Sequence, residues 1–158
     1  MLTSPVSHNL NMNAVTLETE RLRLRMFRED DFESYASICA DAEVMRYIAT
    51  GKPFTRLEAW RHKTFLIGHW QLRGYGPWAV EEKSSRRMIG RIGFLDPDGW
   101  PGFEIGWTLA REVWGKGYAT EGARRAMEYA FTELNQDQSP YPSGVFRFSF
   151  NLIADSID

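Results

Sequence analysis

The sequence predicts an α+β, or mixed α/β, protein in which helices flank a central and mostly antiparallel sheet. Three observations predict this layered fold. A strand-like segment and then helical segments open the chain, three strand-like segments with short turns follow, and an amphipathic helix then crosses back. This order is typical of helices that cover a sheet. The pattern is lost after that helix, so the C-terminal part of the fold is expected to be incomplete.

Length and composition suit one domain. The chain has 158 residues, 43% of them hydrophobic, which is enough for a packed core. The net charge of −2 gives no bulk attraction to nucleic acid or anionic lipid. No apolar run approaches the ~20 residues of a membrane helix, and the single cysteine excludes an intrachain disulfide. We therefore expect a cytoplasmic protein without nucleic-acid or membrane partners. Residues 1–14 are expected to be a flexible tail without a secretory signal, 15–134 the folded domain, and 135–158 an atypical C-terminal segment.

The first half of the chain predicts one strand and three helices. Residues 16–27 alternate apolar side chains with arginines, which predicts a half-buried strand. Helical spacing predicts a helix from Phe32 to Cys39 and a short one over 42–48. Thr55 and Glu58 form a capping-box pattern, which predicts a helix that runs to about Leu72 and stops at Gly74.

The second half predicts three strands and a helix. The strands are expected at 75–82, 88–95 and 103–109, and alternation puts Glu104 and Thr108 on one face of the third. A helix is expected over 118–134. Its apolar stripe would consist of Ala119, Ala123, Ala126, Met127, Ala130, Phe131 and Leu134.

Two glycines, Gly115 and Gly117, lie between the third of these strands and the last helix. Glycine permits a positive φ and lets backbone N–H groups approach a ligand, so a turn before a helix N-terminus can hold phosphate. The spacing of a P-loop is absent, and the third glycine of a dinucleotide fingerprint is replaced by Thr120. A strand-to-helix turn with no ligand remains the alternative from the residues alone.

Four segments in order resemble the GNAT acyltransferase superfamily, and more narrowly its ribosomal-protein alanine N-acetyltransferase branch. They are Leu17–Arg25, Asp41–Ile48, Ile89–Phe94, and the strand and glycine turn that end in Trp-Gly-Lys-Gly-Tyr-Ala-Thr-Glu-Gly. The resemblance covers roughly residues 16–134. It implies acetyl-CoA as co-substrate, no metal, and an amine acceptor, either a protein N-terminus or a small molecule.

The resemblance also implies where acetyl-CoA would bind. The pantetheine arm would pair with the strand that ends in Trp107, Thr108 and Leu109. The pyrophosphate would bind N–H groups of the glycine turn, which are those of Trp114, Gly115, Lys116, Gly117, Tyr118, Ala119 and Thr120. Many members carry Gln or Arg three residues before the first glycine, where this chain has Glu112. No phosphate contact is therefore assigned to that side chain.

Glu104 is the candidate general base, because the acceptor ammonium must lose a proton before it attacks the thioester. The alternative is that Glu104 pairs with a basic residue on a neighbouring strand. A backbone N–H near Thr108 would polarise the thioester oxygen. His62 and His69 are expected on a helix surface. Trp78 and Trp100 are candidates either for the acceptor pocket or for packing.

The tail after Leu134 departs from the family, which continues with a second splayed strand, a helix that often carries a leaving-group tyrosine, and a hairpin. Here a loop-like composition is followed by alternating phenylalanines in 145–158. We interpret this tail as a frameshift, a truncation or an unusual replacement. The phenylalanine segment could replace the second splayed strand or pair with another chain to form a homodimer. Two functions follow: an N-acetyltransferase, or a catalytically impaired CoA-binding or interaction module.

Overall fold

The computed structural model describes residues 14–100, 102–134 and 147–148. In these residues a six-stranded sheet has the order β1-β2-β3-β4-β5-β6, the order of the strands along the chain. The strands are β1 (Leu17–Glu18), β2 (Leu22–Arg25), β3 (Pro77–Glu82), β4 (Arg87–Leu95), β5 (Glu104–Leu109) and β6 (Arg147–Phe148). Neighbours are antiparallel except β5 and β6, which are parallel. The predicted antiparallel sheet with flanking helices is confirmed.

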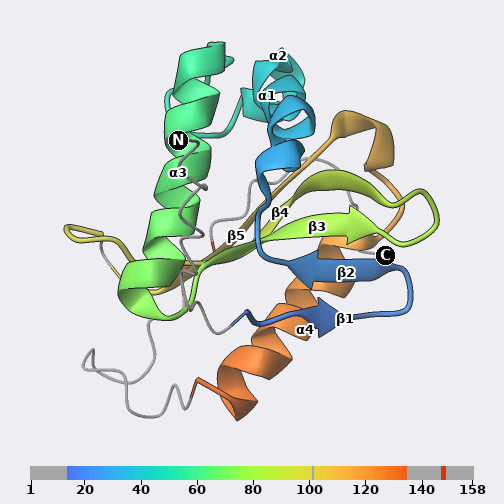
Figure 1. Cartoon of the computed structure of the whole chain (residues 1–158), viewed down its shortest axis with the longest axis vertical. Helices are drawn as coiled ribbons and strands as arrows, with labels where there is room; N and C mark the ends of the chain where they lie inside the picture. The colour runs from blue at the N-terminus through green and yellow to red at the C-terminus, as the bar shows by residue number, and fades with distance from the viewer. Residues whose placement is uncertain (1–13, 101, 135–146, 149–158) are drawn as a thin grey trace, which may run out of the picture.

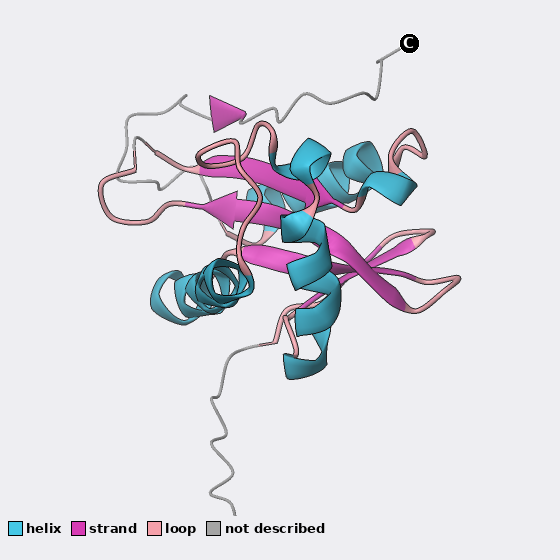
Figure 2. Ribbon diagram, turned by 90° about the horizontal axis from the view of Figure 1, so that it is seen from above, coloured by secondary structure: helices cyan, strands magenta, loops and turns pink. Residues whose placement is uncertain are grey.

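Helices cover both faces of the sheet. Figure 1 shows α1 (Phe32–Ala40), α2 (Ala42–Met45) and α3 (Arg56–Arg73) on one side of the strands and α4 (Tyr118–Thr132) on the other. Two 3-10 turns, Glu29–Asp31 and Arg111–Val113, precede α1 and follow β5. Seen along the long axis of the molecule in Figure 2, β6 is the short arrowhead at the outer edge of the sheet.

Helix α3 begins and ends as the sequence predicts. The Thr55 hydroxyl accepts a hydrogen bond from the Glu58 amide, and the Glu58 side chain accepts one from the Thr55 amide. These bonds satisfy two of the N–H groups that a helix leaves unpaired at its start. Gly74 adopts φ 75°, and its amide binds the carbonyl of Trp70. A left-handed glycine of this kind is a common helix end.

Helix α4 packs closely on the sheet because its contact face is built from small residues. Gly122 lies over β4, where an added Cβ would be only 2.3 Å from Cδ1 of Ile92. Ala123, Ala126 and Ala130 are buried on the same face. Two details of the predicted helix are wrong: α4 ends at Thr132 rather than Leu134, and Phe131 is 56% exposed.

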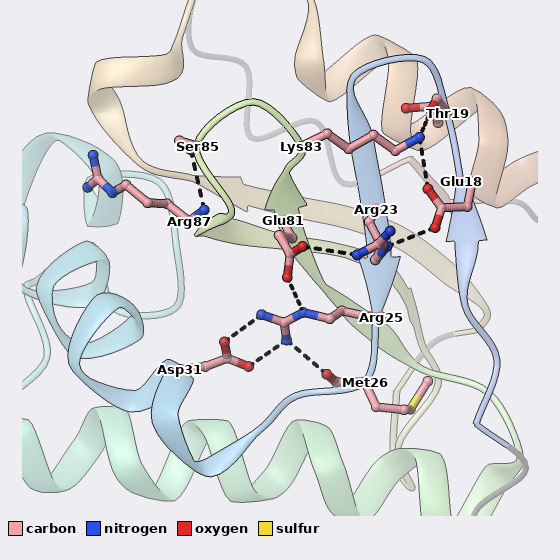
Figure 3. A network of polar contacts seen from close by, with 10 residues as sticks. All are labelled: Glu18, Thr19, Arg23, Arg25, Met26, Asp31, Glu81, Lys83, Ser85 and Arg87. Carbon is pink, nitrogen blue, oxygen red and sulfur yellow. Dashed lines mark hydrogen bonds and ion pairs between the residues drawn. The ribbon is translucent and has the colours of Figure 1, made fainter.

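The first predicted strand is two strands joined by a tight turn. Leu17 pairs with Leu24, so the chain reverses around residues 19–21. The alternation of buried leucines and exposed arginines also fails at Arg25, which is 6% exposed. Its guanidinium binds Asp31 twice, at 2.8 and 2.9 Å, and Glu81 at 2.8 Å (Figure 3). Two carboxylates therefore compensate this buried charge.

Both helical histidines depart from the predicted surface position. His69 is buried, and its Nε2 accepts a hydrogen bond from the amide of Asp96. Its Nδ1 must then carry the proton that it donates to the carbonyl of Tyr75, at 2.8 Å. His69 thus ties the end of α3 to the turn after β4. His62 is half-buried and contacts the hydroxyl of Tyr35 through Nδ1, at 2.7 Å.

The expectations for residues 1–13, 135–146 and 149–158 lie outside the described residues. These are the flexible tail, which was predicted to include residue 14, and most of the atypical C-terminal segment. Within the described part of the chain, no helix has the length and apolar character needed to cross a bilayer.

Candidate functional site

The glycine turn has the backbone geometry of an anion site. Gly115 and Gly117 adopt φ values of 75° and 77°, a region that other residues enter at a cost. Gly117 is the N-cap of α4, and no side chain caps this helix. Among the described residues, the amides of 115–120 donate no hydrogen bond to a protein group. Free N–H groups at a helix start, beside left-handed glycines, favour a bound anion.

Arg21 holds this turn from the other end of the chain. Its guanidinium binds the carboxylate of Glu121, in the first turn of α4, at 2.7 Å, and donates to the carbonyl of Lys116 at 2.8 Å. The same guanidinium lies 4.5 Å from the ring centre of Tyr118. The Arg21 amide and the Thr19 hydroxyl also donate to Glu121. These contacts fix the shape of the turn before any ligand binds.

The electrostatics of this anchor keep Glu121 ionised. Burial alone would raise the pKa of Glu121, but hydrogen bonds from Thr19 and Arg21 outweigh it and hold the pKa below its ordinary value. A charged Glu121 can therefore bind Arg21 throughout the neutral range. The sequence did not predict this contact between Arg21 and Glu121, because the two residues are 100 positions apart in the chain.

Two aromatic residues of the turn are also fixed. Tyr118 is buried, and its hydroxyl donates to Glu82 at 2.8 Å. The indole of Trp114 donates to the carbonyl of Leu109 at 3.0 Å, which ties the turn to β5. Their side chains therefore shape the turn. The amide of Tyr118 remains for a phosphate group, whereas the predicted contact through Trp114 is disfavoured, because the Trp114 amide donates to the carbonyl of Arg111 at 3.1 Å.

The described part of β6 pairs with the first two residues of β5. The parallel register joins Glu104 to Arg147 and Ile105 to Phe148. Within the described residues, no strand of the sheet pairs with Thr108 or Leu109 on that side. Both residues lie shortly before the glycine turn in the chain. The edge of a strand can pair with an extended ligand.

Glu104 and Thr108 share a face of β5, as alternation predicts, but their surroundings differ. Glu104 is half-buried and accepts a hydrogen bond from the indole of Trp100 at 2.9 Å. Thr108 is 5% exposed, and its hydroxyl has no partner among the described residues. The residue in register with Glu104 on β6 is basic, so the predicted ion-pair alternative for Glu104 stays open.

Trp78 and Trp100, each predicted either to line the acceptor pocket or to pack, lie in different surroundings. Trp78 is fully buried in the core, where its ring contacts Trp70, Phe94 and Tyr129. Trp100 is 42% exposed and lies against Glu104 through its indole N–H. Trp78 therefore belongs to packing, and Trp100 belongs to the surroundings of the candidate base.

A buried polar cluster next to this site was missed. Arg91, on β4, is 6% exposed and is in register with Thr108. Its charge helps to lower the pKa of His62 to about 4, after burial, and it also lies near Tyr35 and Cys39. A charged residue within the otherwise apolar run 88–95 was the signal that could have revealed it.

No metal centre is built into the described part of the chain. There, no three His, Cys, Asp or Glu side chains are arranged to hold a metal ion.

Comparisons with known proteins agree with this geometry. The profile of the Acetyltransferase (GNAT) domain matches residues 21–145, and so extends past Leu134, where the sequence pattern alone is lost. The chain is 35% identical, over 122 residues, to the uncharacterized N-acetyltransferase p20 of Bacillus licheniformis. That match covers 76% of this chain and 68% of the relative.

Two further proteins extend the comparison. The FsC-acetyl coenzyme A-N(2)-transacetylase of Aspergillus fumigatus is 31% identical over 139 residues, which are 75% of this chain and 54% of that enzyme. The crystal structure of an acetyltransferase from Agrobacterium tumefaciens superposes with a TM-score of 0.69 at 31% identity. It covers 80% of this chain and 72% of that structure.

Proposed function

Because the chain belongs to the GNAT acetyltransferase family and is an acyltransferase, we propose that it transfers the acetyl group of acetyl-CoA to a primary amine. One observation supports acetyl-CoA as the co-substrate. Among the described residues, the amides of 115–120 donate to no protein group, and they stand at the N-terminus of α4 shortly after β5. A pyrophosphate needs such a row of N–H donors, and the pantetheine arm would then lie along β5.

The binding energy would be distributed over the site. One charge at a helix N-terminus contributes about 0.3–1 kcal/mol when exposed, whereas micromolar affinity needs about 8 kcal/mol. Several N–H···phosphate bonds from the turn, together with strand-like pairing to Trp107, Thr108 and Leu109, would supply the remainder. Lys116 is exposed beside the turn and adds a positive charge.

Glu104 would act as the general base. It would take a proton from the acceptor ammonium, and the freed amine nitrogen would bond to the acetyl carbon as the carbon–sulfur bond breaks. The nitrogen would then lose a second proton to solvent to give the amide, and the departing thiolate would take a proton from solvent. The Trp100 indole would orient the carboxylate of Glu104, which it contacts at 2.9 Å. A backbone N–H near Thr108 would stabilise the negative charge that develops on the carbonyl oxygen.

The acceptor would be a protein N-terminus or a small amine. One relative is named for transfer to an N(2) nitrogen, and a solved structure that shares the fold at 17% identity is named a ribosomal-protein-S5-alanine acetyltransferase. The second likeness supports only the fold. A ribosomal-protein acceptor therefore remains one member of the panel to be tested.

Two measurements test the proposal. Acetyl-CoA should raise the melting temperature, and thiol should be released with at least one amine of a panel that includes peptide N-termini. Glu104→Gln should lower kcat by about 10²–10⁴-fold while acetyl-CoA affinity is kept. The control is Glu43→Gln, because that exposed side chain lies on α2, away from β5 and the glycine turn, and pairs with Arg46 at 3.9 Å. A thermal shift without thiol release would favour an impaired CoA-binding module, and no shift would contradict both functions.

A further inference from the structure

Arg91 is a buried cation with no carboxylate partner in the part of the chain that the structure describes. It lies in the middle of β4 and is 6% exposed. Its Nε and Nη1 are inaccessible to solvent and have no hydrogen-bond partner, and no ion pair to Arg91 occurs among the described residues. An unpaired buried charge is costly, and such a group in a native protein requires an explanation.

The titratable groups beside Arg91 are neutral at pH 7. Burial raises the pKa of Tyr35 far above its ordinary value and that of Cys39 to about 11. Burial, and then the charge of Arg91, lower the pKa of His62 to about 4. The three buried carboxylates among the described residues are engaged elsewhere: Asp31 and Glu81 bind Arg25, and Asp96 accepts from the Tyr75 hydroxyl at 3.1 Å. Among the described residues, the positive charge of this cluster is therefore not compensated.

A second orphaned polar group lies on the adjacent strand. Thr108 is in register with Arg91, and its buried hydroxyl has no partner within the described residues. On the same face, two residues earlier, an added Cβ at Gly106 would meet no described atom within 4 Å except Glu104 Oε1, at 3.8 Å. Space is therefore open over Gly106, between Glu104 and Thr108 along β5, whereas the Thr108 hydroxyl and Nε and Nη1 of Arg91 are closed to solvent.

We propose that Arg91 and Thr108 form a carboxylate-binding subsite for the amine acceptor, which would then be an amino acid or an amino-acid conjugate with a free carboxylate. The proposal rests on the assignment of Glu104 as the base. Glu104 and Thr108 are four residues apart, or about 13 Å along the strand, and the flexible Glu and Arg side chains can both reach over Gly106. The amine would lie at Glu104 and the carboxylate at Arg91.

The charge of the cluster favours a carboxylate over a phosphate group. One cation with neutral donors matches a monoanion, whereas a phosphate monoester carries about −1.5 to −2 charges at pH 7. A guanidinium–carboxylate pair is also among the strongest polar contacts in proteins. Because Nε and Nη1 are closed off in the unliganded protein, Arg91 must change rotamer when the acceptor enters.

Matched pairs of acceptors test the subsite. Each amino acid is compared with the amine formed by loss of its carboxylate, and thiol release gives kcat/KM. The wild type should prefer the amino acid. Arg91→Met should lower kcat/KM for the amino acid by about 30-fold or more and change that for the decarboxylated amine by less than about threefold. Thr108→Val should reduce the same preference by a smaller factor. Arg87→Met, on the exposed end of the same strand, is the control and should change neither.

Stability and cofactor binding separate the subsite from other roles of Arg91. Arg91→Met should keep or raise the melting temperature of the free protein, because it removes an unpaired buried charge. It should also leave acetyl-CoA affinity unchanged. Equal losses with both amines, or weaker acetyl-CoA binding, would overturn the subsite and make Arg91 a general or cofactor residue.

The subsite can be judged even if the proposed function fails. If the wild type releases no thiol with any amine, titration calorimetry measures binding of the same amino acids to the wild type and to Arg91→Met. Binding to the wild type alone would support the carboxylate site. Equal binding, or none, would contradict it.

Discussion

The carboxylate of Glu121 binds the guanidinium of Arg21 at 2.7 Å, and so joins the first turn of α4 to the start of β2. Arg21 also donates to the carbonyl of Lys116 within the glycine turn. The shape of the proposed pyrophosphate site therefore depends on a residue near the opposite end of the described chain.

Breaking this link should weaken cofactor binding. Arg21→Met removes the contacts to Glu121 and Lys116, and we expect the Kd for acetyl-CoA to rise about 10-fold, or about 1.4 kcal/mol, by calorimetry. Glu121→Gln keeps the charge of Arg21 but weakens the anchor, so it should also raise the Kd. The control is Arg23→Met, whose side chain is equally exposed and pairs with Glu18. Equal effects of the two arginine substitutions would contradict an anchoring role.

Replacing a glycine of the turn should affect both stability and binding. Gly117→Ala places a side chain at φ 77°, which costs about 1–2 kcal/mol, and the strained turn should bind acetyl-CoA about 10-fold less tightly. Gly99→Ala is a matched control, because Gly99 has φ 80° and no atom within 4 Å of an added Cβ. It should lose similar stability, measured by urea unfolding, and keep its affinity. A turn without a ligand would show no difference in affinity between the two variants.

The buried pair of Asp31 and Arg25 should dominate the stability of the α1 end of the sheet. Asp31→Ala leaves Arg25 with Glu81 alone and should lower the free energy of unfolding by about 3–5 kcal/mol. The control is Glu33→Ala, which removes an ion pair whose side chains are 76% and 64% exposed. It should change stability by less than about 0.5 kcal/mol.

The ion pair of Asp31 and Arg25 also predicts that the free energy of unfolding decreases at acid pH. Burial alone would raise the pKa of Asp31, but hydrogen bonds from Arg25 and from the Arg28 amide hold it below 3.8. A depressed carboxyl pKa stabilises the fold above the unfolded pKa, and that contribution is lost as the pH falls below 3.8. The difference in unfolding free energy between the wild type and Asp31→Asn should therefore shrink there.

His62 predicts a second pH dependence at higher pH. Its folded pKa is about 4 against an ordinary value of 6.5, so the unfolded chain binds a proton more readily. Stability should fall as the pH drops from 6.5 towards 4, by roughly 3 kcal/mol at most. His62→Gln should flatten this slope in unfolding titrations. A folded His62 that titrates near 6.5 by NMR would contradict the prediction.

Local signals in the sequence predicted most of the fold. The capping box at Thr55, the stop at Gly74 and the glycines before α4 each depend on neighbouring residues, and the structure confirms them. Alternation within β5 likewise placed Glu104 and Thr108 on one face, although their proposed roles stay predictions. Such features can be predicted without knowing which distant residues pack against them.

The errors have the opposite origin, because they depend on distant partners. Arg25 was expected to be exposed by alternation, but Asp31 and Glu81 make its burial tolerable. His69 was expected on the surface, yet the carbonyl of Tyr75 and the amide of Asp96 give it a buried place. Arg91 was passed over because a strand period cannot show whether a charge is paired.

The chain order of the strands has a consequence for folding. Each strand from β2 to β5 pairs with the one before it in sequence, so these contacts of the sheet can form while the chain is still being synthesised. Helix α4 follows these five strands and packs over Ile92, Leu22 and Trp78. Until it docks, this apolar face of the sheet is open, and apolar surface that is exposed during folding favours aggregation. Docking of α4 also brings Glu121 to Arg21. The glycine turn would therefore take its final shape in the same step that covers the apolar face of the sheet.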